Sequence, residues 1–152
     1  MPSHPAEVLI VRTRENPDLP LPEAATPGSA GLDLRACVPR PVVLEPGRRM
    51  LIPTGFCIAL PEGYEGQVRP RSGLALRQGL SMLNTPGTID ADYRGEIGVI
   101  AVNLGQEPVT ISRGDRIAQL VIAPVARPRL VAVDELPPSA RAAGGFGHTG
   151  TT

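Results

Sequence analysis

The sequence contains no lysine: its 15 basic residues are all arginines, and 15 acidic residues bring the formal net charge to zero. The absence of lysine excludes a Walker A phosphate loop, so any phosphate must be bound by guanidinium groups, hydroxyls and backbone amides. Zero net charge leaves no basic surface for nucleic acid or an anionic membrane, and we expect neither partner. No apolar run approaches the length that a membrane span needs.

Cysteine and histidine are also rare, with two of each: Cys37, Cys57, His4 and His148. These positions are too scattered for a zinc site. No charged and then apolar leader precedes the cysteines, so we expect reduced thiols and a cytoplasmic protein.

The 17 glycines and 18 prolines fall between short apolar runs, with one strand and turn in roughly every eight to twelve residues. This spacing is typical of an all-β jelly-roll barrel or sandwich. We expect one domain over residues 1–136 and a flexible, Gly-rich C-terminal arm over 137–152. One short helix is expected at 72–79, with Ser72 as its N-cap and Gly79 after its end. The expected strands cover residues 8–11, 29–37, 42–44, 50–52, 56–60, 65–68, 97–104, 108–111, 117–122 and 130–133.

Three segments of the expected β domain allow more specific predictions. Residues 53–55, Pro-Thr-Gly, are expected to form a turn between two strands. The run 97–104 is almost entirely apolar, which indicates a strand buried on both faces. Residues 29–37 alternate instead, so Leu32, Leu34 and Ala36 share one face while Asp33 and Arg35 share the other, which presents Asp33 outward.

The stretch 84–95 is dense in polar groups, with an amide, two carboxylates, a phenol and a guanidinium between two apolar runs. Asp90 and Asp92 are costly to bury unpaired, so they must face water, a cation or a ligand. The turn residues around Thr88 and Ile89 predict a short strand and a hairpin. A solvated hairpin tip is the alternative interpretation, because Asn, Asp, Gly and Pro also favour turns for backbone reasons.

A second candidate site lies at the start of the expected helix, where Arg71, Ser72 and Gly73 combine a guanidinium, a hydroxyl and an accessible amide. Such a group suits an anion. The alternative is that Ser72 only caps the helix while Arg71 pairs with a structural carboxylate such as Asp115. Gln119, polar between Ala and Leu on a strand, faces either a ligand or water.

The arm contains Arg141 and Phe146 among glycines. Its composition alone favours disorder. One aromatic ring and one guanidinium on a mobile segment also suit a lid that stacks on a base and clamps a phosphate.

Five blocks, at residues 30–36, 70–75, 84–95, 113–119 and 144–150, resemble in order and spacing the motifs of the deoxyuridine triphosphate nucleotidohydrolase (dUTPase) family of trimeric type. The resemblance implies a jelly-roll homotrimer whose active sites are each built from three subunits. It implies Mg²⁺-dependent hydrolysis of dUTP to dUMP and pyrophosphate, which limits uracil incorporation into DNA and supplies dUMP for thymidylate synthesis. The two rival functions are a dCTP deaminase, which shares the fold, and a catalytically silent nucleotide sensor.

The resemblance also implies a role for each candidate residue. Asp90 would be the general base that activates water for attack on the α-phosphorus. Tyr93 would stack under the deoxyribose, and both residues can serve one substrate only if an irregular hairpin bends between them. Asp92 would brace this bend. The uracil would be read by Asn84 and by the backbone around Thr88, Ile89 and Gly98.

The phosphate chain would be held by Arg71, Ser72, Gly73 and Gln119. Asp33 would sit near the Mg²⁺ ion, through water. From a neighbouring subunit, Phe146 would cover the uracil and Arg141 would contact the γ-phosphate. His148, where many members carry serine, is left without a role.

Overall fold

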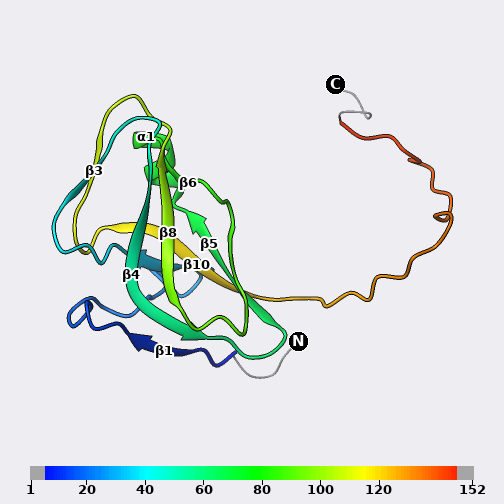
Figure 1. The fold of residues 1–152 in the computed structure, drawn as a ribbon, viewed down its shortest axis with the longest axis horizontal. Coiled ribbons are helices and arrows are strands. Elements are labelled where there is room, and N and C mark those ends of the chain that lie inside the picture. Colours follow the sequence, from blue (N-terminus) through cyan, green and yellow to red (C-terminus); the bar gives the residue numbers. More distant parts are fainter. Residues whose placement is uncertain (1–5, 147–152) are drawn as a thin grey trace.

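The computed structural model describes residues 6–146. These residues form an all-β fold with one short helix, as expected (Figure 1). The elements are β1 (Leu9–Arg12), β2 (Leu32–Arg35), β3 (Val42–Leu44), β4 (Arg49–Ala59), β5 (Tyr64–Pro70), α1 (Ser72–Gln78), β6 (Leu80–Met82), β7 (Gly87–Ile89), β8 (Glu96–Asn103), β9 (Val109–Ile111) and β10 (Arg116–Pro124).

Two four-stranded sheets and one two-stranded sheet enclose the core. Their strand orders are β1-β4-β8-β6, β2-β10-β5-β7 and β3-β9, and every pairing is antiparallel. Alternate side chains of both larger sheets point inward, among them the fully buried Leu34, Ile52 and Ala118. The same alternation turns Asp33 and Gln119 outward, so polar side chains lie on the outer face of the β2-β10-β5-β7 sheet.

Strand β4 contradicts the turn expected at residues 53–55, because the strand continues through them. The register to β8 shifts between Pro53 and Cys57, which marks a bulge that accommodates the proline. Gly55 has φ +75 within it, and the buried Asn16 donates from Nδ2 to the Gly55 oxygen at 3.1 Å. A long-range side-chain contact therefore replaces the turn that the local sequence predicted.

The end of the chain also differs from expectation. Residues 130–133 form no strand. Strand β10 ends at Pro124, and the chain after it extends away from the barrel and leads into the arm (Figure 1). Leu130 on this arm is 91% exposed. A strand needs a partner for its backbone groups, and the described part of this chain offers none there. The boundary expected at residue 136 stays a prediction.

Strand β8 is only partly the doubly buried strand that was expected. Its N-terminal half alternates, with Ile97 and Val99 buried and Gly98 and Ile100 half-exposed, whereas residues 101–103 are all buried.

Helix α1 begins at Ser72, and its N-cap is the extended Arg71 without a side-chain capping bond. The expected N-cap Ser72 is therefore wrong by one position, because β5 ends at Pro70 and Arg71 continues its extended conformation. Gly79 follows the helix as predicted, with φ 69 and its N–H donated to the Ala75 oxygen. Within residues 6–146, no helix is long and apolar enough to cross a membrane.

Candidate active site

A cavity of about 400 Å³, which we call the arginine cavity, brings together candidate residues from three distant segments. Asp33 on β2 lies opposite Gln119 on β10, which in turn lies opposite Arg69 on β5. This row on the outer face of the sheet meets the start of α1 at one end. The lining includes Ser29, Gly31, Asp33, Arg69, Arg71, Ser72, Gly73, Arg77 and Gln119.

Asp33 is the centre of an ion-pair network in this cavity. Its Oδ1 lies 3.2 Å from Arg71 Nε, its Oδ2 lies 3.1 Å from Arg116 Nη1, and its side chain is only 15% exposed. Arg71 Nη1 also donates to the Arg116 oxygen at 3.2 Å. Arg71 does pair with a carboxylate, as the alternative interpretation expected, but the partner is Asp33 and not Asp115, which accepts the Ser112 N–H within its own turn. The network fixes the guanidinium of Arg71 at the cavity wall.

Arg116 is a further residue of this cavity's ion-pair network, which the sequence did not indicate. It lies inside the block 113–119, but only the register of β10 against β2, Arg116 opposite Arg35, shows that it reaches Asp33. A basic residue at the start of a strand that also carries Gln119 was the available signal.

Gln119 does not simply face water or a ligand. Its Nε2 donates to the Pro70 oxygen at 2.9 Å, which holds the backbone directly before Arg71. A Cβ on Gly31 would lie 2.2 Å from Gln119 Oε1, so a side chain there would push this amide aside. The Gln119 amide thus holds the backbone before Arg71 and packs closely against Gly31.

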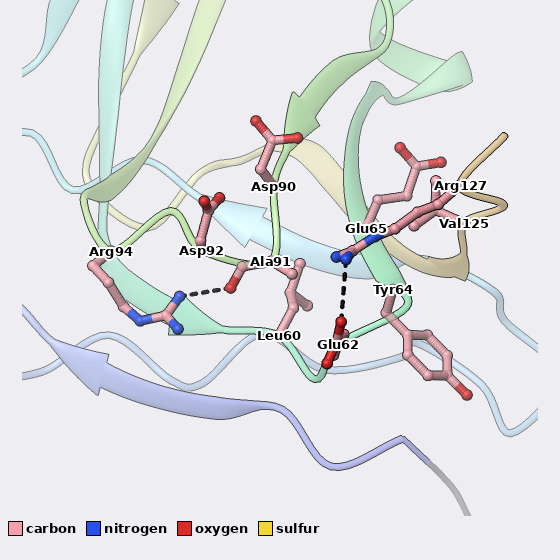
Figure 2. Close-up of a pocket in the computed structure, with 10 residues that line it drawn as sticks. All are labelled: Leu60, Glu62, Tyr64, Glu65, Asp90, Ala91, Asp92, Arg94, Val125 and Arg127. Carbon is pink, nitrogen blue, oxygen red and sulfur yellow. Dashed lines mark hydrogen bonds and ion pairs between the residues drawn. The ribbon is translucent and has the colours of Figure 1, made fainter. Parts of the chain in front are cut away.

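Asp90 lines a different cavity, of about 680 Å³, which we call the carboxylate cavity (Figure 2). It shares no lining residue with the arginine cavity. Ile89, next to Asp90, pairs with Gly66 near the start of β5, whereas Arg71 follows its end at Pro70. Four residues of strand separate these levels by about 13 Å. The charged lining residues are Glu62, Glu65, Asp90, Asp92, Arg94 and Arg127.

The bend expected after Asp90 is confirmed, but the hairpin is wrong. The Tyr93 N–H donates to the Asp90 oxygen at 3.1 Å and closes a turn. Strand β7 pairs with β5, however, and β8 pairs with β4 and β6, so the turn crosses from one sheet to the other. Local turn chemistry predicts a reversal, but it does not determine which strands pair.

Side-chain contacts hold this turn. Arg94 Nη1 donates to the oxygens of Ala91 at 2.7 Å and Tyr93 at 2.9 Å, while the Tyr93 hydroxyl lies 3.1 Å from the Glu96 oxygen. The Tyr93 ring covers Gly95, where a Cβ would lie 2.3 Å from its hydroxyl. Asp90 and Asp92 stay exposed on either side of Ala91.

The residues expected to read the base flank the same turn. Asn84 and Thr88 are exposed, whereas Ile89 is 6% exposed and contributes its side chain to the core. Ile89 therefore offers only its backbone to a ligand. A Cβ at Gly98 on β8 would lie 2.6 Å from Leu51 Cδ1, so a side chain there would displace the exposed Leu51 side chain.

Arg141 and Phe146 of the arm line neither cavity in this chain. Arg141 Nε donates to the Gly144 oxygen at 2.7 Å, and Phe146 is fully exposed on the extended arm (Figure 1). His148 and the rest of the last block lie outside the described residues.

An ion pair between Arg113 and Asp18 lies away from both cavities. The Arg113 guanidinium hydrogen-bonds Asp18 and holds the pKa of that carboxyl below its usual value, while partial desolvation opposes the shift. Arg113 also donates to the Glu15 oxygen and to Cys37 Sγ, so it anchors the segment between β1 and β2. Residues 6–146 contain no cluster of three or more His, Cys, Asp or Glu suited to hold a metal ion.

Comparison with known proteins adds independent information. A family model described as dUTPase matches residues 18–150. The chain is 61% identical over 137 residues to a deoxyuridine 5'-triphosphate nucleotidohydrolase of Anaeromyxobacter sp., covering 90% of the chain and 92% of the relative. It is 56% identical over 151 residues to a protein of the same name from Beijerinckia indica subsp. indica, covering 98% of the chain and 94% of the relative.

Solved structures agree. A mutant dUTPase of Staphylococcus bacteriophage 80alpha with dUpNHpp superposes with a TM-score of 0.81 at 28% identity, over 95% of this chain and 99% of that one. A mutant dUTPase of phage phi11 of S. aureus, described with a structural Mg(II) ion, gives a TM-score of 0.75 at 27% identity, over 85% of this chain and 97% of that one.

Proposed function

Because the chain belongs to the dUTPase family and hydrolyses dUTP to dUMP and pyrophosphate, we propose that Asp90 and the arginine cavity perform this reaction together, from different subunits of a homotrimer. The activity limits the dUTP available to polymerases and supplies a thymidylate precursor. The observation that carries the proposal is the separation of the first four sequence blocks into two cavities on one chain.

Asp90 is the general base. Its carboxylate accepts a hydrogen bond from the attacking water and takes the proton as the oxygen bonds to the α-phosphorus and the bond to the pyrophosphate oxygen breaks. The turn that Arg94 braces holds this carboxylate in place. Asp92 makes no hydrogen bond or ion pair within residues 6–146, where Arg94 holds the turn, and we assign it no proton transfer.

The arginine cavity holds the phosphate chain. Arg71 offers a guanidinium whose position Asp33 and Arg116 fix, Ser72 offers a hydroxyl, and Gly73 lets an oxygen approach the backbone. Gln119 keeps the segment before Arg71 in place through its bond to the Pro70 oxygen. Preorganised donors of this kind favour the charge that develops during phosphoryl transfer.

The donor set also fits Mg²⁺ bound mainly by triphosphate oxygens and water. Asp33 is the only carboxylate that lines the arginine cavity, and both of its oxygens are already engaged by arginines. It therefore suits an outer position, through water, and the ion would neutralise phosphate charge.

Base and sugar selection belongs to the turn and its neighbours. Asn84 and the backbone of Thr88, Ile89 and Gly98 read the uracil edge and exclude a thymine methyl group. Tyr93 lies under the deoxyribose and leaves no room for a 2′-hydroxyl.

The trimer solves the distance problem. A general base must lie within hydrogen-bond reach of the attacking water, yet Asp90 and Arg71 lie beyond opposite ends of a strand segment of about 13 Å in one chain. A neighbouring copy brings its Asp90 to this arginine cavity, and the arm of a third brings Arg141 and Phe146.

The free thiols of Cys37 and Cys57 suit a reducing compartment, and we place the enzyme in the cytoplasm.

The activity is tested by pyrophosphate release from dUTP, dCTP, dTTP and UTP, with and without Mg²⁺, while ammonia is followed. We expect rapid release from dUTP only. Ammonia from dCTP would assign the deaminase reaction, and binding of dUTP without turnover would indicate a sensor.

Subunit sharing is tested by complementation. Asp90→Asn and Arg71→Gln proteins, each inactive, are unfolded together and refolded as mixed trimers. If a site takes Asp90 and Arg71 from different subunits, random mixing restores about a quarter of the sites. If both residues serve from one subunit, mixing restores none, and the shared site is refuted. Each variant refolded alone is the control.

A further inference from the structure

Arg77 differs from the other arginines of the arginine cavity. Arg71 is paired with Asp33, and Arg69 donates from Nε and Nη2 to Gln67 Oε1. Arg77 lines the same cavity, but within residues 6–146 its guanidinium has no hydrogen-bond or ion-pair partner. Arg77 thus adds to the cavity an exposed positive charge that no side chain among residues 6–146 pairs with.

The helix directs this side chain into the cavity. Arg77 is in the last turn of α1, four residues after Gly73, so the two positions lie on the same helix face. A Cβ built on Gly73 would lie 3.1 Å from Arg77 Nη2, 3.2 Å from Nη1 and 3.4 Å from Cζ. The whole guanidinium therefore lies over the first turn, because helical side chains lean toward the N-terminus.

The same geometry gives a reason for glycine at position 73 beyond backbone approach. A side chain there would press against the guanidinium, which glycine lets approach the first turn closely. A basic residue in a last helical turn commonly interacts with the free carbonyls at the C-terminus. Here the charge lies at the opposite end of the helix, beside Arg71 and Ser72.

We propose that Arg77 is a further substrate-binding residue, which contacts the β- and γ-phosphates and thereby selects the triphosphate over dUMP. An unpaired guanidinium binds phosphate oxygens through two parallel N–H donors. The β- and γ-phosphates carry the charge that distinguishes substrate from nucleotide product, so a contact there favours dUTP binding and leaves dUMP release unhindered. This inference rests on the proposed phosphate-binding role of the arginine cavity.

The test measures the affinity of Arg77→Gln for dUMP, dUDP and the non-hydrolysable α,β-imido-dUTP, with Mg²⁺ present. We expect about five- to tenfold weaker binding of imido-dUTP, a smaller loss for dUDP and no change for dUMP. Arg77→Lys, which keeps the charge but loses the paired donors, should recover part of the difference. Equal weakening of all three ligands, or of none, would overturn the proposal.

Two further variants interpret the result. Arg49→Gln removes an exposed arginine from β4 in the other sheet and should leave all three affinities unchanged. Arg71→Gln tests the cavity itself. If Arg71→Gln weakens imido-dUTP binding while Arg77→Gln does not, only the role of Arg77 fails. If neither substitution matters, the phosphate assignment of the arginine cavity fails as well.

Discussion

Replacing Asp33 by asparagine separates two effects that act in opposite directions on substrate binding. The variant keeps the shape of the side chain but removes the only carboxylate lining the arginine cavity. If the cavity only needs positive charge, affinity for dUTP rises, since the remaining arginines attract the triphosphate more strongly. If Asp33 holds Arg71 in place, catalytic efficiency falls.

The network predicts a loss. The Oδ1 atom of an asparagine still accepts a hydrogen bond from Arg71 Nε. The asparagine NH₂ group, however, replaces the carboxylate oxygen that lies 3.1 Å from Arg116 Nη1, so two hydrogen-bond donors face each other there. Partly exposed ion pairs contribute about 1 kcal/mol each, so we expect a loss of about 1–2 kcal/mol, which is about 5- to 30-fold in kcat/KM. Steady-state pyrophosphate release measures this change.

A control substitution and a double-mutant cycle test whether Asp33 acts through Arg71. Glu45→Gln removes an exposed carboxylate from the turn between β3 and β4 and should change little. Arg116→Gln should lose as much as Asp33→Asn, and the double variant should lose less than the sum, because both act through Arg71. The concentration of Mg²⁺ giving half-maximal rate should rise for Asp33→Asn only. An unchanged or higher kcat/KM in Asp33→Asn would refute the positioning argument.

Four further predictions concern other parts of the molecule. Asp90→Asn should lower kcat by about 10²- to 10⁴-fold while imido-dUTP still binds, and near-normal turnover would exclude Asp90 as the base. Gly55→Ala should lower the free energy of unfolding by about 2–4 kcal/mol in urea titrations, because φ +75 and a side chain at 2.4 Å both oppose a Cβ; an unchanged midpoint would contradict the bulge geometry. Removal of residues 137–152 should abolish turnover without changing the trimer seen by light scattering, whereas full activity would exclude a lid. Asp18→Asn should destabilise the protein at neutral pH but not in acid. The folded pKa of Asp18 is lowered, so its stabilisation is present above the unfolded pKa and is lost as the pH falls through the folded value; equal destabilisation at both pH values would contradict this.

Several parts of the site could be predicted because they depend on local chemistry. The alternation around Asp33 placed its carboxylate outside the core, and the exposed Asp90 and Asp92 follow from the cost of burying unpaired charge. Gly79 ends the helix because the residue there adopts φ 69. These outcomes require only neighbouring residues.

Other parts could not be predicted, because their partners are remote in the chain. The sequence around Pro53 predicts a turn, because the bulge in β4 and the hydrogen bond from Asn16 involve residues remote in the chain. The ion pair of Arg116 with Asp33 forms only because β10 pairs with β2. Arg77 differs from Arg71 and Arg69 because, within residues 6–146, only its guanidinium among the three has no partner. This difference depends on side-chain contacts that the sequence does not show.

The class of fold, the family and the candidate site residues follow from the amino-acid sequence alone, since strand spacing and ordered motifs are properties of short segments. The grouping of those residues into two cavities depends on the tertiary structure. Strand pairing places Asp90 near one end of β5 and Arg71 beyond the other, and the rise of an extended chain keeps them apart. That separation depends on which strands hydrogen-bond to which, and no local pattern of residues specifies it.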